Sequence, residues 1–213
     1  MTEQDWNDCT DPTPMLECLR GKVSDRKLRL FAAACFHYVR ELEDSNPRRI
    51  LIEVFERVAD GKETRAQLMS AREDICSDDW DLGSATRTNS SWECARAAVH
   101  DATMFQAHVA HCKALDKNES ISRDDALLAA IEVEGIAAIA EHKLEASLIR
   151  CIFGNPFRPT PVSDHWPPTV VQLAQAQYNG QDCSFALHDA LLEAGHADLA
   201  EHFSKEQWHP KGC

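Results

Sequence analysis

Residues that begin and end helices divide most of this chain into short segments. Serine, threonine or asparagine precedes runs in which apolar residues recur every three or four positions, and glycine often follows these runs. In the segment 24–42, for example, Leu28, Phe31, Cys35 and Val39 share one helical face behind a capping serine. Aromatic residues make up only 7% of the chain and alanine is abundant, which favours helix over strand. The sequence therefore predicts an all-α protein.

The pattern predicts a single helical-bundle-like domain, 1–213, of about eight or nine helices. Thr13 and Pro14 are the expected cap and first residue of the first helix. The longest expected helix, 122–154, has a length of about 48 Å, which exceeds the width of a compact domain of this size. We therefore expect a bend or break near Gly135.

A proline-rich segment, 154–168, precedes the last three expected helices and holds five of the nine prolines. Gly154 is expected to end the preceding helix in a left-handed conformation. Because prolines keep a chain extended, we expect this segment to act as a strap that Phe153, Phe157 and Trp166 fasten to the helices. The short helices of 169–213 are expected to pack on it.

Charge is distributed unevenly along the chain and limits its partners. The net charge is −13, but eight basic against four acidic residues between Arg20 and Arg49 leave that segment at +4 and the remainder at −17. Nucleic acid is disfavoured as a general partner, because phosphate contacts need concentrated positive charge. Arg26 and Arg29 are candidate binding residues for an acidic partner or one anionic group. Arg158 and His165, which a rigid strap would hold in fixed directions, are two further candidates.

The sequence contains no expected membrane span, since no apolar run approaches the roughly 18 residues that a spanning helix needs. Its polar first residues lack the basic and apolar parts of a secretory signal, so we expect a cytoplasmic protein. The nine cysteines are then expected to be reduced, and most of them to be small buried apolar residues. No two of them have the C-x-x-C spacing of zinc ribbons.

Histidines provide the metal candidates, of which there are two sets. His108 and His111 lie three residues apart on one expected helix and are weak candidates for a shared ion. The second set lies near the C-terminus, ahead of Cys213, at spacings that do not share one helix face, so only the folding of several short helices would bring its members together. This set consists of His188, His196, His202 and His209. The favoured interpretation is that neither set binds a metal and that the protein has no cofactor.

Three blocks of the sequence together resemble a family of proteins from planctomycete bacteria. They are TDPTPMLECLRGKVSDRKLRLFAAAC near the start, IFGNPFRP in the middle, and VVQLAQAQYNG near the end. The resemblance extends over nearly the whole chain and implies a bacterial protein. It implies no activity and no catalytic residue.

The sequence favours a helical interaction module that binds a protein partner and carries out no chemistry. It contains no nucleophile elbow and no glycine-rich phosphate loop, and an acidic body with one basic segment suits electrostatically steered docking. The alternative is a metal- or small-molecule-dependent enzyme with dispersed histidine ligands in a helical bundle, such as His108, His111 and His142 or the C-terminal set. An anion or nucleic-acid binder that uses the segment 20–49 is a third hypothesis.

Overall fold

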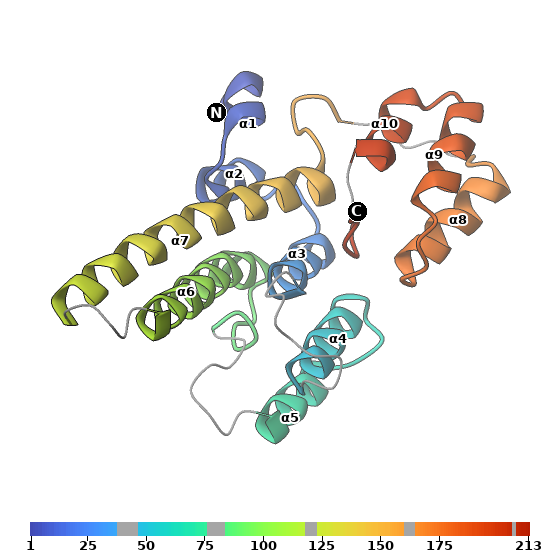
Figure 1. Ribbon diagram of the computed structural model, residues 1–213. Coiled ribbons are helices and arrows are strands. Elements are labelled where there is room, and N and C mark those ends of the chain that lie inside the picture. The colour runs from blue at the N-terminus through green and yellow to red at the C-terminus, as the bar shows by residue number, and fades with distance from the viewer. Residues whose placement is uncertain (38–46, 76–83, 118–122, 160–164, 206–207) are drawn as a thin grey trace.

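The structure, a computed structural model, describes residues 1–37, 47–75, 84–117, 123–159, 165–205 and 208–213. These residues form ten α-helices and no strand, which confirms the all-α prediction (Figure 1). The helices are α1 (Glu3–Asp8), α2 (Pro12–Leu19), α3 (Asp25–His37), α4 (Pro47–Ala59), α5 (Arg65–Ile75), α6 (Ser91–Lys117), α7 (Arg123–Phe153), α8 (Pro168–Tyr178), α9 (Ser184–Glu193) and α10 (Ala197–Lys205). Among them, none is both long and apolar enough to cross a membrane.

The main core lies between the two longest helices and the helices packed around them. α6 and α7 lie side by side in opposite directions, α3 packs against both, and α4 and α5 extend from α3 as a pair (Figure 1). α2 covers the C-terminal half of α7. The largest side chains of this core are almost completely buried and come from the first and last thirds of the chain: Trp6, Met15, Phe31, Phe55, Ile149 and Ile152.

Local capping explains where the structure departs from the predicted helix boundaries. α2 begins at Pro12 rather than at Pro14, because the carboxylate of Asp11 accepts a hydrogen bond from the backbone N–H of Thr13 at 2.9 Å and caps the helix two residues earlier. The described residues form one helix more than the eight or nine predicted, and this additional helix is α1, which has only six residues. It is held by a capping box between Thr2 and Asp5, and it is too short to show a hydrophobic period.

α7 is one continuous helix of 31 residues, so the predicted break near Gly135 is wrong. Gly135 does not have a positive φ, and a Cβ atom added to it would meet no other atom within 4 Å. The helix therefore passes through this glycine undisturbed. Its N-terminal half extends beyond α2 instead of bending to stay within the body (Figure 1). Gly154 has a φ of +71° and ends α7, as predicted.

The last three helices form a small second core of their own. Val170, Leu187, Leu191 and Ala200 are buried in it, and Trp166 packs against it from the strap. The ring of Trp166 lies 4.5 Å from that of His196. Of the three aromatic residues expected to fasten the strap, Trp166 packs on these helices and Phe153 packs against the main core, whereas Phe157 is 40% exposed. Residues 160–164 of the strap lie outside the described residues.

Two carboxyl groups are buried between α6 and α7. Glu145 is fully buried and Glu141, one turn earlier, is 5% exposed. Thr103 of α6 donates a hydrogen bond of 3.4 Å to Oε2 of Glu145, whereas Oε1 of each glutamate has no hydrogen-bond partner among the described residues. Burial raises the pKa of Glu141 to about 7 and that of Glu145 to about 9, the latter with a contribution from its like-charged neighbour. Both groups are therefore protonated in the folded protein at mildly acidic pH.

Candidate metal centre

Two cysteines and two histidines from three separate parts of the chain meet where α7 ends. Cys151 lies in the last turn of α7, His202 lies on α10, and His209 and Cys213 lie in the C-terminal segment 208–213. One potential ligand atom from each residue lies within 4.8 Å of all the others. We call this set the Cys₂His₂ cluster.

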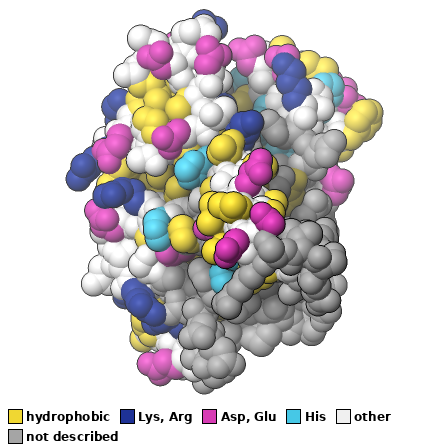
Figure 2. All heavy atoms as spheres, turned by 60° about the vertical axis from the view of Figure 1, so that its left-hand side comes forward, with side chains coloured by type: hydrophobic (Ala, Val, Ile, Leu, Met, Phe, Trp, Pro, Cys, Tyr) yellow, Lys and Arg dark blue, Asp and Glu magenta, His cyan; other side chains and the backbone are white. Residues whose placement is uncertain are grey.

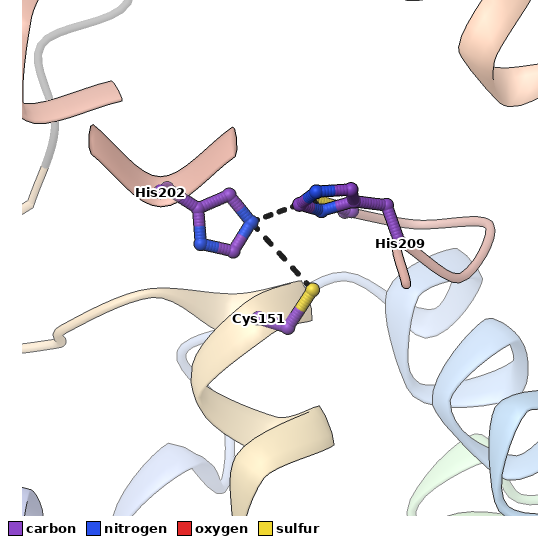
Figure 3. A group of neighbouring side chains, drawn as sticks. Cys151, His202 and His209 are labelled. Carbon is purple, nitrogen blue, oxygen red and sulfur yellow. Dashed lines mark hydrogen bonds between the residues drawn. The ribbon is translucent and has the colours of Figure 1, made fainter. Parts of the chain in front are cut away.

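The side chains of the cluster point toward a common centre (Figure 3). Nε2 of His202 lies 3.7 Å from Sγ of Cys151 and 3.0 Å from Sγ of Cys213. Sγ of Cys213 lies 3.6 Å from Nδ1 of His209. The ring of His209 packs against the rings of His202 and Phe203, at centroid distances of 4.9 and 4.6 Å, which holds it in place.

These distances agree with the ligand shell of a tetrahedral zinc ion. Zinc binds thiolate sulfur at about 2.3 Å and imidazole nitrogen at about 2.0 Å, so neighbouring ligand atoms of a tetrahedral site lie about 3.3–3.8 Å apart. Two thiolates with two imidazoles are also the donor set that selects zinc over magnesium or calcium, which prefer oxygen. The cluster therefore needs only small side-chain adjustments to hold Zn²⁺.

The environment of the cluster favours the thiolate form that a metal requires. Hydrogen bonds from the Cys151 thiol and from the two imidazoles hold the pKa of the Cys213 thiol far below its usual range, although burial acts against this. Cys213 is exposed as a residue, but its sulfur faces the cluster. Metal ligands of this kind must lose their proton, so the surroundings of Cys213 prepare it for binding.

Lys27 of α3 lies beside the two sulfur atoms. Its ammonium group donates a hydrogen bond of 2.6 Å to the backbone carbonyl of Ile152, one of the free carbonyls at the end of α7. Burial lowers the pKa of this ammonium group, whereas the neighbouring Cys213 and Cys151 act in the opposite direction. Lys27 therefore caps the helix that carries Cys151 and supplies positive charge beside both thiols.

His209 contains an unpartnered polar atom. The residue is 9% exposed, and its Nε2 is buried with no hydrogen-bond partner in the described part of the chain. A buried polar atom without a partner costs about 1–3 kcal/mol. The nitrogen that faces the cluster is Nδ1, 3.6 Å from Sγ of Cys213, so a metal bound there would leave Nε2 as a separate buried N–H group.

Contacts of the two residues before Cys213 hold the C-terminal segment against the body. Lys211 donates a hydrogen bond of 2.6 Å to the buried carboxylate of Glu56, which also lies 2.8 Å from the imidazole of His37. Gly212 has a φ of +102°, and a Cβ atom added to it would lie 3.2 Å from Cβ of Leu30. Only glycine fits this close approach without strain, and the approach brings Cys213 to the cluster.

We expect Gly212→Ala to weaken zinc binding by about 10–100-fold, the effect typical of changes to the groups that support metal ligands. The added methyl group would meet Leu30 and disfavour the positive φ, which would move Cys213 away from the other ligands. Competition against a chromophoric zinc chelator measures the affinity. Gly180→Ala is the matched control, because Gly180 also has a positive φ but has open space around it. Equal affinities for the two variants would contradict this role of Gly212.

The weak histidine candidates of α6 are not part of the cluster. Nδ1 of His111 lies 3.1 Å from a carboxylate oxygen of Glu134 on α7, and Nε2 of His108 lies 3.5 Å from Sγ of Cys112, one turn away. Neither histidine belongs to a group of three or more potential ligands among the residues that were placed. The structure therefore does not bring His108 and His111 together with further ligands.

The two basic candidates of α3 make contacts within the protein. The guanidinium group of Arg26 donates to Asp60 at 3.0 Å and to the hydroxyl group of Tyr178 at 2.8 Å, which ties α3 to α8. It lines a groove of about 1210 Å³ between the body and the last three helices, whose wall includes Cys151, His202 and Cys213 of the cluster. Arg29 donates to the backbone carbonyl of Asn89 at 3.1 Å. The two side chains thus point to different neighbours.

The strap candidates also lie apart from the cluster residues. The guanidinium group of Arg158 is 78% exposed and lies 2.6 Å from a carboxylate oxygen of Glu3. His165 is exposed and directly precedes Trp166. The structure brings Arg26, Arg29, Arg158 and His165 into no common site, and their role as binding residues stays a prediction.

Sequence reasoning found three of the four cluster residues but not the site. It grouped His202 and His209 with Cys213, but also with His188, which faces Asp189, and His196, which packs on Trp166. Cys151 carried no signal, because it belongs to an ordinary helical segment far away in the sequence. No family model, no curated protein and no solved structure matches this chain.

Proposed function

We propose that this protein is a zinc-binding helical protein, in which Cys151, His202, His209 and Cys213 together hold one Zn²⁺. The observation that carries the proposal is the convergence of two sulfur and two nitrogen atoms, all within 4.8 Å of one another, from three segments of the chain. Chance proximity of four such residues is uncommon in an interior where cysteine is usually packed against apolar neighbours. Zinc bound in this way would fasten the last three helices to the end of α7.

A zinc ion held by four protein side chains has a structural role. Catalytic zinc sites keep one coordination position for water or substrate, whereas the Cys₂His₂ set fills all four. This supports the hypothesis of an interaction module over the hypothesis of a metal-dependent enzyme. We infer that the protein's function is to bind a protein partner through a helical body that zinc completes. A reducing cytoplasm suits such a centre, and the eight described cysteines are all free.

The direct test is the metal content of protein purified without an affinity tag. We expect close to one zinc per chain for the wild type, and a loss of most of it for Cys151→Ser and for His202→Asn. Replacement of zinc by Co²⁺ provides an independent readout, because a tetrahedral cobalt site with two thiolates has intense visible bands and sulfur-to-metal charge-transfer absorption.

A histidine and a cysteine of α6, which lie outside the cluster, provide matched controls for these substitutions. His108→Asn and Cys112→Ser remove a neighbouring histidine and cysteine outside the cluster, and zinc content should stay close to one per chain. Two results would overturn the proposal: wild-type protein that neither retains zinc nor forms a tetrahedral cobalt complex, or an equal loss of zinc in the α6 variants.

A further inference from the structure

The N-terminal half of α7 exposes a row of large apolar side chains. Leu128 is 67% exposed, Ile131 53%, Ile136 60% and Ile139 59%. Leu128, Ile136 and Ile139 lie on the side of the helix away from Glu141 and Glu145, which face the core, so these three side chains point away from the body. Figure 2 shows hydrophobic side chains at the surface on the side of the molecule where this half of α7 lies, with acidic and histidine side chains around them.

The same face of α7 is covered further along the helix. Ala146 and Ile149 are completely buried where α2 packs on α7. Arg150 holds this region by donating to the backbone carbonyls of Trp6 and Cys9. The exposed row thus continues the surface of α7 on which α2 already packs. A second helix laid against it would complete the packing that α2 begins.

The charges at the two ends of this face point to one partner. Glu132, Ile136, Ile139 and Lys143 follow one another at spacings of four, three and four, so they form one short seam along a single face of the helix. All four are exposed, with the acid at one end and the lysine at the other. A second copy laid antiparallel brings Ile136 against the partner's Ile139 and Glu132 against the partner's Lys143, twice over. A parallel copy would set like charges opposite each other.

We propose that this face of α7 is a homodimer interface, in which two copies of the chain pack α7 against α7 in antiparallel orientation. The seam from Glu132 to Lys143 is about 16 Å long, and α2 lies beyond its C-terminal end. Gly135 and Ala140 flank it and let the two backbones approach closely. A crossing angle of about 50° lets the helix ends diverge past α2. The proposal rests on α7 alone and is independent of zinc.

The first test is the mass of the zinc-loaded protein in solution. Sedimentation equilibrium at about 1–100 µM should give a mass that rises from one chain of 23.9 kDa toward two. Ile139→Glu should raise the dissociation constant at least about tenfold, since it puts an unpaired charge at the centre of the contact. Phe185→Glu, at a residue of α9 that is 78% exposed, should not change it. A wild type that stays monomeric, or an I139E protein that still dimerises, overturns the proposal.

The second test distinguishes the antiparallel copy from any other arrangement. E132K and K143E should each weaken self-association, because each puts like charges opposite one another at both ends of the seam. A mixture of the two variants should dimerise, since every contact between an E132K chain and a K143E chain again joins opposite charges. Native mass spectrometry of a mixture with one isotope-labelled chain detects this species. Absence of the mixed dimer, with both single variants monomeric, rules out the antiparallel pairing.

Discussion

Removing zinc with a strong chelator is expected to unfold α8, α9 and α10 while the core built from α2 to α7 stays folded. In the described part of the chain the second core contains four buried apolar side chains, and the three helices have 11, 10 and 9 residues. Units below about 70 residues rarely stabilise themselves without a disulfide, a metal or a partner. The Cys₂His₂ cluster joins this unit to the body, so its metal contributes much of the unit's stability.

The remaining contacts between the two parts are too few to replace the metal. Among the described residues, the main polar ones are the hydrogen bonds of Tyr178 with Asp60 and Arg26 and the contact of Lys211 with Glu56 at 2.6 Å. Hydrogen bonds that involve a charged group contribute about 1.5–3 kcal/mol each. Structural zinc sites contribute on the order of 10 kcal/mol of binding free energy at neutral pH. Zinc therefore contributes more than these polar contacts to holding the last three helices on the body.

Hydrogen exchange followed by mass spectrometry tests this expectation, because it measures the protection of the backbone amides peptide by peptide. Peptides from α8 to α10 should lose protection after chelation, whereas those from α3, α6 and α7 should keep it. Cys151→Ser should reproduce the chelated pattern without chelator, and Cys112→Ser should behave like the wild type. A uniform loss of protection throughout the chain would show instead that zinc stabilises both cores as one cooperative unit.

Local signals account for most of the predicted fold. The Ser24 hydroxyl group accepts a hydrogen bond of 3.3 Å from the backbone N–H of Lys27, as expected of a helix cap, and Gly154 ends α7 with a positive φ. Such features depend on a few neighbouring residues, so the sequence shows them directly. The predicted start of α2 is wrong by two residues. Asp11 and Thr13 are both residue types that cap helices well, and only the surrounding structure selects one of them.

The candidate site depends on contacts that no local pattern records. Cys151 meets His202 because α7 runs without a break to its end and because the C-terminal segment returns to it. That return depends on Gly212 against Leu30 and on Lys211 against Glu56, which are contacts between residues far apart in the chain. The spacing of the histidines alone therefore could not separate His202 and His209 from His188 and His196.

Glu145→Gln is expected to make the protein more stable at pH 8 and to change its stability little at pH 5. The folded protein keeps a proton on Glu141 and Glu145, whose pKa values are raised to about 7 and about 9. The unfolded chain releases these protons near pH 4.5. Their favourable contribution is thus complete below pH 4.5 and is lost as pH rises through the folded-state values. Each pKa unit corresponds to about 1.4 kcal/mol, so the loss between pH 5 and pH 8 is on the order of several kcal/mol.

Urea unfolding of the zinc-loaded protein at a series of pH values measures this dependence. The gain in the free energy of unfolding of Glu145→Gln over the wild type should grow from pH 5 toward pH 9, because the amide has no proton to lose. Comparison of the two proteins at each pH cancels the pH dependence of zinc binding, which they share. Glu93→Gln, at an exposed position of α6, should match the wild type at every pH. If Glu145→Gln gained no stability over the wild type between pH 5 and pH 8, the Glu145 carboxyl group would have to be solvated or paired in the folded protein. Burial of Glu145 beside Thr103, with one oxygen lacking a partner among the described residues, opposes that outcome.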